Sequence, residues 1–412
     1  MKGSALGEWT HACAVALAAA AACLAASQLL DPGLAHSSAA NLWFGSDLPY
    51  RLEVMVRPGG WEGGGAHPLF PTLGHLLLAG STALTGQADP LRAAGLAGSV
   101  VGGLFAGILF ALFRRMGLAR ADATLFAAIG ALSSGSLFWF PVPESFGLAG
   151  AGVALALLVA ASSRPSVGAL AAACVASGAS VLTSGIVGGL AVVAHDGHPR
   201  RWGRALTSLL VALGVMTAAW SLQEWSFRTP FFLGDRLLEY RQHTFPVTLE
   251  RVNDVARGLL CHSVVAPALR NDRPSFRRVE LASSGLLGAT ATLAWVALLA
   301  AGSWRTLQSA RRGEGRELAL TVAGSLGLTF AMHLTLGREL FLYALSVLPM
   351  LLVLAAGSAR PGRGLTLVRV VACVLLLAGG LNNARQLHRA AGVARDLAAQ
   401  RVPAGAGAGE ER

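Results

Sequence analysis

The chain has 412 residues, of which 54% are hydrophobic and only 13% are charged, and its mean hydropathy is +0.56. Soluble domains carry about 25% charged residues, so this composition excludes an ordinary soluble domain and indicates lipid as the main solvent. The net charge of +11 does not indicate nucleic-acid binding, because the cations separate apolar segments instead of gathering with aromatic residues on one soluble face.

Long runs without Asp, Glu, Lys or Arg follow one another along the chain. A membrane-crossing helix needs roughly 20 apolar residues, and such runs lie at 12–30, 93–113, 123–143, 145–163, 166–194, 205–223, 281–304, 318–337 and 340–359, with a shorter one at 370–384. The Gly- and Ser-rich run 166–194 is expected to form a hairpin of two helices. We predict an all-α polytopic membrane protein with about 11 transmembrane helices, a re-entrant or surface helix and an outer-face loop region.

Short Arg-rich connections set the expected orientation, because such loops face the cytoplasm. Four loops qualify; they carry Arg114, Arg115 and Arg120; Arg200, Arg201 and Arg204; Arg305, Arg311, Arg312 and Arg316; and Arg360 and Arg363. Placing these loops inside leaves outside residues 31–92, the turn 141–146, the connection 222–280 and the turn at Arg338 and Glu339. This assignment requires that 67–85 dip into the membrane without crossing it.

We expect one integral membrane domain over residues 1–400 and a Gly- and Ala-rich tail, 401–412, that is disordered by composition. The first apolar segment is interpreted as an uncleaved helix, because Lys2 is offset by Glu8. The long connection 222–280 contains "LLEYRQHTFPVTLERVNDVARGLL", whose apolar spacing is typical of an amphipathic helix on the membrane or over the site; a simple connector is the alternative. The five cysteines form no CxxC pair and predict no disulfide framework or zinc site.

The first outer loop concentrates ionisable side chains in "FGSDLPYRLEVMVRPGGWEGGGAHPLFPTLGHLL", residues 44–77. Asp47 precedes Leu48-Pro49 as an N-cap does, so one interpretation is a helix over 48–57 that Asp47 caps, with Arg51 as its (i, i+4) partner. The other is chemical: Asp47 takes a proton from a hydroxyl acceptor, while Arg51 or His67 offsets charge on a departing phosphate. The two interpretations are compatible, because a cap also fixes a carboxylate in space.

Further candidates share the outer boundary. Glu144 lies in "WFPVPESFGLAG", where an ionisable group is either functional or an acid favoured by a helix N-terminus. Arg338 and Glu339 form either part of a site or an ordinary solvated turn, and His333 is better explained as a hydrogen-bonded structural histidine. No GxxxxGK[ST], GxSxG, HExxH or DxD motif occurs.

Three segments resemble the GT-C glycosyltransferases, which include the protein O-mannosyltransferases, the lipid A aminoarabinose transferases and the rhizobial core-type transferases. The acid after the first helix followed by "HPLFP" is similar to their first outer loop, "PVPESFGLAG" to their second outer turn, and "GRELFLYALSVLPMLLVLAA" to their R-Y-x-x-P-x-x-P helix. His67-Pro68 is followed by Leu69 instead of a second Pro. A single Asp47 replaces an acidic pair, which leaves Glu53 as a second candidate acid and argues against a tightly held metal.

The resemblance implies a hexosyl- or pentosyltransferase of the bacterial inner membrane, with its active site facing the periplasm. It would move a sugar from a polyprenyl-phosphate donor to a hydroxyl of a glycan, lipid or protein acceptor, with inversion, and it implies no cofactor, although a divalent metal stays open. By matched position Asp47 is the general base, and Arg51 and His67 lie near the donor phosphate. Arg338 and Tyr343 belong to the helix that closes the lipid groove, and Glu144 is a second acid or an acceptor-binding residue.

Other classes of protein also fit parts of the chain. A secondary transporter would suit the many Gly-rich helices, but transporters usually keep ionisable groups near mid-membrane and show internal repeats. A ligase or polymerase of lipid-linked glycans would place its chemistry in 222–280 instead of 44–77. A non-catalytic membrane scaffold would not require the acids at the outer boundary.

Overall fold

The computed structural model describes residues 5–35, 42–60, 66–196, 201–228, 244–269, 279–280, 285–337, 340–362 and 364–401. Within these ranges the chain is almost entirely helical. Besides two isolated bridges, the strand pairing in this part of the chain is one antiparallel pair of two-residue strands, β1 (Ala268–Leu269) and β2 (Val279–Glu280). The predicted all-α class is confirmed, whereas the disorder predicted for the tail falls outside the described residues beyond Arg401.

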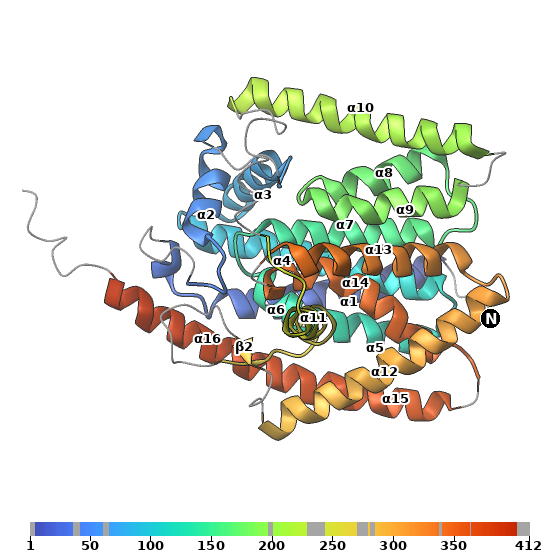
Figure 1. Cartoon of the computed structure of the whole chain (residues 1–412). Helices are drawn as coiled ribbons and strands as arrows, with labels where there is room; N and C mark the ends of the chain where they lie inside the picture. Colours follow the sequence, from blue (N-terminus) through green and yellow to red (C-terminus); the bar gives the residue numbers. More distant parts are fainter. Residues whose placement is uncertain are drawn as a thin grey trace, which may run out of the picture.

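Seven helical segments of the described chain are long and apolar enough to cross a membrane, as expected for a membrane protein. They are α1 (Ala5–Ser27); α4 (Pro90–Arg115); α10 (Trp202–Phe227); α12 (Gly285–Arg311); α13 (Arg316–Thr335); η9, α14 and η10 (Leu340–Tyr343, Ala344–Ala356, Gly357–Ala359); and α15, η11 and α16 (Leu365–Val374, Leu375–Gly379, Gly380–Arg401). Most of these segments run side by side in one bundle (Figure 1).

Shorter helices complete the bundle. The run 123–143 divides into α5 (Arg120–Ala131) and α6 (Ser134–Trp139), because the side chain of Ser133 accepts a hydrogen bond from the backbone of Ser136 and starts a new helix. After α7 (Ser145–Ala160), the run 166–194 forms α8 (Val167–Gly178) and α9 (Gly185–Asp196), joined at the short turn η4 (Leu182–Ser184). The predicted two-helix hairpin is therefore confirmed.

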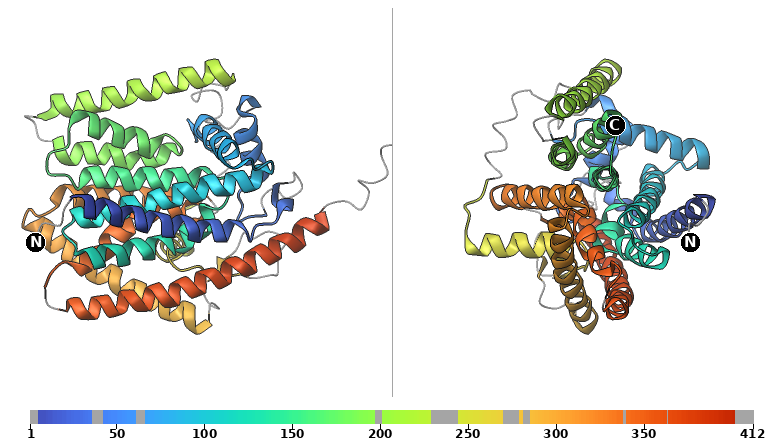
Figure 2. Two further views of the ribbon diagram at one scale, coloured as in Figure 1. Left: turned by 180° about the vertical axis from the view of Figure 1, so that it is seen from behind. Right: turned by 90° about the vertical axis from the view of Figure 1, so that its right-hand side faces the viewer.

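Four short helical segments between Pro32 and Thr85 gather at one end of the bundle (Figure 1). They are η1 (Pro32–Ala35), α2 (Leu48–Val56), η3 (Pro58–Gly60) and α3 (Phe70–Thr85). From the long connection, α11 (Leu249–Ala256) and the π-turn η7 (Arg257–Cys261) are described, and α11 lies across the bundle axis (Figure 2). The predicted amphipathic helix is thus present in its second half, and residues 229–243 lie outside the described part.

Ion pairs show which end of the bundle the first and the last helix reach. At the end opposite α2, Glu8 of α1 accepts hydrogen bonds from Arg114 and Arg120, at 2.9 and 3.1 Å. At the α2 end, Arg395 of α16 pairs with Asp31 at 3.2 Å. The beginning of α1 and the end of α16 therefore lie at opposite ends of the molecule (Figures 1 and 2).

Candidate functional site

A buried aromatic anchor fixes the start of α2. The backbone of Phe44 and Gly45 turns through the left-handed region, with φ of 50° and 79°. The indole nitrogen of Trp43 donates to the carbonyl of Phe138 at 3.2 Å, and the ring of Phe44 packs 5.0 Å from that of Phe341. This anchor holds the next two residues, Ser46 and Asp47, in a defined place at the end of the bundle.

Asp47 occupies the N-cap position of α2, as predicted, but its side chain makes no capping hydrogen bond. Burial raises the pKa of the Asp47 carboxyl, the positive charge of Arg51 opposes this effect, and the negative charge of Glu144 adds to it. A half-buried carboxylate that does not cap its helix remains available to accept a proton.

The prediction that Asp47 and Arg51 form an ion pair along α2 is wrong. The guanidinium of Arg51 instead lies 3.4 Å from Oε1 of Glu144, whose side chain is only 1% exposed. A carboxylate buried to this degree is strongly destabilising without a cation, whereas the half-buried Asp47 keeps part of its hydration. The ion-pair partner of Arg51 is therefore Glu144, and not Asp47 as the spacing in the sequence predicted.

Glu144 is fully engaged by its neighbours. Its Oε1 accepts from Ser46 Oγ at 2.9 Å, and its Oε2 accepts from the backbone nitrogen of Ser145 at 2.6 Å and from Ser145 Oγ at 3.1 Å. The acid thus caps α7, which was one of the two interpretations of its sequence context. With these bonds and the Arg51 ion pair, Glu144 is placed to orient Arg51 and not to receive a proton from substrate.

His67 holds the other side of Arg51. Its Nε2 lies 3.0 Å from Nη2 of Arg51, and its Nδ1 lies 2.8 Å from Ser145 Oγ and 3.1 Å from the carbonyl of Ser180. A guanidinium can only donate, so Nε2 is the acceptor and this network assigns the proton to Nδ1. Burial lowers the pKa of His67 well below its usual range, and the charge of Arg51 lowers it further. His67 is therefore neutral at pH 7.

The "HPLFP" segment pairs with the tip of the α8–α9 hairpin. The backbone nitrogen of Leu69 donates to Ala179 at 2.8 Å, and that of Leu182 donates to the carbonyl of Ala66 at 3.0 Å. Sequence reasoning missed Ser46, Ser145 and Ser180 as members of the site. The helix start at Ser145 carried a signal, but Ser180 contributes a backbone carbonyl, which no residue pattern reveals.

An aromatic row leads from His67 to Tyr343 of η9 and His333 of α13. The ring of Phe146 lies 5.9 Å from that of His67 and 5.2 Å from that of Tyr343, whose ring in turn lies 4.2 Å from His333. Phe146 thus links Tyr343 to His67, which in turn contacts Arg51. Arg338, predicted with Tyr343 as part of the helix that closes the lipid groove, lies outside the described residues.

Glu53 does not join the cluster. Its side chain is exposed on α2, two positions after Arg51, and it makes no hydrogen bond or ion pair with a described side chain. Of the two acids left open by the sequence, the structure brings Asp47 and not Glu53 toward Arg51 and Glu144.

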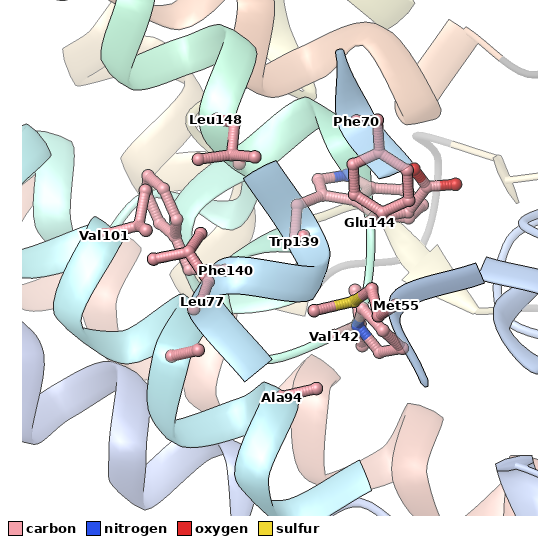
Figure 3. Close-up of a pocket in the computed structure, with 15 residues that line it drawn as sticks. Met55, Phe70, Leu77, Ala94, Val101, Trp139, Phe140, Val142, Glu144 and Leu148 are labelled. Carbon is pink, nitrogen blue, oxygen red and sulfur yellow. The ribbon is translucent and has the colours of Figure 1, made fainter. Parts of the chain in front are cut away.

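An apolar pocket adjoins the cluster between α3, α4 and the α6–α7 turn (Figure 3). Its empty volume is about 350 Å³, counting space open to the surroundings, and its lining includes Met55, Phe70, Leu77, Val101, Trp139 and Leu148. Glu144 is the one charged residue that lines it, and Phe70 lies beside Glu144 in Figure 3. The guanidinium carbon of Arg51 lies 5.8 Å from the centre of the Phe70 ring, so the charged cluster and the pocket are contiguous.

No group of three or more His, Cys, Asp or Glu side chains placed to hold a metal occurs among the described residues. The chain matches no protein-family model, no curated protein and no solved structure. Its function must therefore be inferred from the chemistry of this cluster.

Proposed function

We propose that the protein is a GT-C-type membrane glycosyltransferase that moves a sugar from a polyprenyl-phosphate donor to an acceptor hydroxyl at the periplasmic face of the bacterial inner membrane. The observation that carries this proposal is the position of Asp47 beside an Arg51 held by both Glu144 and His67, next to an apolar pocket. The resemblance of three outer segments to that superfamily supports it.

In the proposed reaction Asp47 accepts the proton of the acceptor hydroxyl as that oxygen attacks the anomeric carbon of the donor sugar. The bond from the anomeric carbon to the phosphate oxygen breaks on the opposite side, so the configuration inverts and the electron pair leaves with the polyprenyl phosphate. Arg51 stabilises the developing phosphate charge. Its two buried partners keep the guanidinium in one orientation before substrate binds.

The charge of the cluster requires a further cation. Ionised Asp47 and Glu144 with one Arg51 sum to −1, and the neutral His67 adds nothing. A phosphate leaving group therefore needs more positive charge than Asp47, Glu144, Arg51 and His67 supply together, and we assign this role to Arg338, which lies outside the described residues. Its neighbour in sequence, Gly337, lies against the ring of Tyr343, which reaches the cluster through Phe146. His67 then acts as a positioning residue for Arg51 instead of binding phosphate directly.

The same proposal assigns the membrane topology. We count the seven long apolar segments and four shorter units, α5 with α6, α7, α8 and α9, as eleven crossings. This odd number accounts for the beginning of α1 and the end of α16 lying at opposite ends of the bundle (Figure 1). The Arg-rich loops face the cytoplasm, α3 dips without crossing, and the prenyl chain of the donor lies in lipid on the apolar side of the cluster, where the pocket opens.

A deletion strain tests the proposed activity. We expect loss of one sugar from an envelope glycolipid, glycan or glycoprotein, detected by mass spectrometry of extracted products, and restoration by the wild-type chain but not by Arg51→Ala. The proposal would be contradicted if the deletion strain had the same glycoconjugates as the wild type. It would also be contradicted if Arg51→Ala, present in the membrane at wild-type level, restored the missing sugar.

The ligase or polymerase alternative predicts a different pattern of mutants. In the described part of the long connection, Arg251 donates to the carbonyls of His333 at 2.6 Å, Leu336 at 3.2 Å and Gly337, so it serves to cap α13. The side chain of Arg257 is exposed and makes no hydrogen bond or ion pair with a described residue, so a substitution there is the better test of this alternative. If Arg257→Ala abolishes sugar transfer while Asp47→Asn does not, the chemistry belongs to that connection.

A further inference from the structure

The face of α15 and α16 that points away from the bundle changes character along its length. Leu367, Val370, Leu377 and Leu381 are 54 to 67% exposed, as expected of a ridge that faces lipid acyl chains. After Leu381 this face exposes the small Ala384 and then Arg385, His388 and Arg389, one and two turns further on. The ridge therefore passes from apolar to cationic within one helical turn.

These three side chains have no protein partner in the described part of the chain. The side chains of Arg385, His388 and Arg389 make no hydrogen bond or ion pair with any described residue. Two other cations of this helical segment are paired: Arg369 donates to both carboxylate oxygens of Asp122, at 2.7 and 3.0 Å, and Arg395 pairs with Asp31. The cationic stretch is thus an exception on its own helix.

Its distance along the helix places it at the level of lipid headgroups. Eighteen residue steps separate Leu367 from Arg385, and at about 1.5 Å per residue they span roughly 27 Å. The hydrocarbon core of a bilayer is about 30 Å thick. A helix with Leu367 near one boundary of the core therefore brings Arg385, His388 and Arg389 to the other boundary.

We propose that Arg385, His388 and Arg389 bind the phosphodiester headgroup of an anionic phospholipid whose acyl chain lies along Leu377 and Leu381. Two guanidinium groups separated by one turn offer forked donors to a single phosphate. A zwitterionic headgroup brings its own cation to this positive surface, whereas phosphatidylglycerol brings only the phosphate charge. The site is thus selective for anionic lipid, independently of the proposed transfer reaction.

A tryptophan at Leu381, on the exposed ridge, reports the lipid beside this surface. The full-length Leu381→Trp variant is reconstituted in vesicles of phosphatidylglycerol and phosphatidylcholine, with bromine on the acyl chains of one lipid or the other. The quenching of tryptophan fluorescence by the brominated lipid is measured, and the quenching of the native tryptophans in the wild-type protein is subtracted. We expect the relative affinity for phosphatidylglycerol at this position to exceed that for phosphatidylcholine several-fold. Leu213→Trp, on the exposed face of α10, serves as a control and should show a ratio near 1.

Charge variants then assign the preference to the named residues. Adding Arg385→Gln and Arg389→Gln should bring the ratio at residue 381 to about 1, whereas the paired Lys substitutions should retain most of it. Equal quenching by both lipids with the arginines intact would overturn the proposal. Displacement of brominated phosphatidylglycerol by a few mole per cent of polyprenyl phosphate would also overturn it and would assign the surface to the carrier lipid.

Discussion

Asp47 and Glu144 lie in the same cluster, but their carboxylates are suited to different roles because their surroundings differ. Glu144 is buried and receives hydrogen bonds on both oxygens together with the Arg51 ion pair. Asp47 is half-buried, does not cap its helix, and has its pKa raised by burial. One acid is therefore suited to hold a cation and the other to exchange a proton.

The raised pKa of Asp47 predicts a shifted pH–rate profile. In the proposed reaction transfer requires the ionised carboxylate, so kcat/KM should fall as pH decreases through the pKa of Asp47, with a midpoint above the ordinary value of 3.8. The measurement is kcat/KM against pH in proteoliposomes. A profile that stays flat down to the ordinary aspartate range would show that Asp47 is not the titrating base.

The neutral, buried His67 predicts a loss of stability in mild acid. Its pKa in the folded protein is lower than its unfolded value near 6.5, so the unfolded chain binds the extra proton as pH falls below that value. This one group should lower the free energy of unfolding by about 1.4 kcal/mol per pH unit between its two pKa values.

The check for His67 is thermal unfolding in detergent between pH 7 and pH 5. Burial also lowers the pKa of His262, to about 4, so part of the acid sensitivity will persist without His67. The His67→Gln variant should depend less steeply on pH than the wild type. Equal slopes for the two proteins would contradict the assignment of His67 as neutral.

At the scale of elements, close backbone contacts hold α7 against the α8–α9 hairpin that carries Ser180. A Cβ placed on Gly152 of α7 would lie 2.0 Å from the carbonyl oxygen of Ala176, and one on Gly188 of α9 would lie 2.4 Å from the Cα of Cys174. These glycines let helices approach as closely as small residues commonly do in membrane bundles. They also bring Ser145 and Ser180 to the same histidine.

Gly152→Ala should therefore separate α7 from α8. We expect a loss of about 1–3 kcal/mol, typical of overpacking, because the neighbouring atoms are backbone and cannot rotate away. Gly189→Ala is the matched control, because a Cβ there meets nothing within 4 Å. A melting temperature that falls for Gly189→Ala as much as for Gly152→Ala would contradict this account of the packing.

The spacing of apolar residues, and the charged residues that separate the apolar runs, predicted most helices. These include α2 with Asp47 at its N-cap and the two-helix hairpin of 166–194. They could not predict which acid pairs with Arg51, because Glu144 is 93 positions away and the choice depends on burial. Likewise, the role of Ser180 depends on a hairpin tip meeting His67 in space. Local pattern specifies elements, whereas partners depend on the packing of distant segments.

For the whole molecule, the proposed topology places the two ends of the bundle on different sides of the membrane. With the native cysteines replaced, single cysteines at Gln87 and Asp396 should react with an impermeant maleimide from the periplasm. A cysteine at Glu314, which is exposed near the other end, should react only after the membrane is opened. Labelling of Gln87→Cys from the cytoplasm alone would contradict both the topology and the dipping of α3.

The central claim is that Asp47 and its neighbours form the catalytic centre, and the most direct test compares two acids on one short segment. Asp47→Asn and Glu53→Gln each remove one negative charge at α2, but only Asp47 lies toward Arg51 and Glu144. In a deletion strain that expresses each variant at wild-type level, Asp47→Asn should lower sugar transfer by about 10²- to 10⁴-fold, and Glu53→Gln should leave it within about twofold. Full transfer by Asp47→Asn, or equal losses in both variants, would contradict the account.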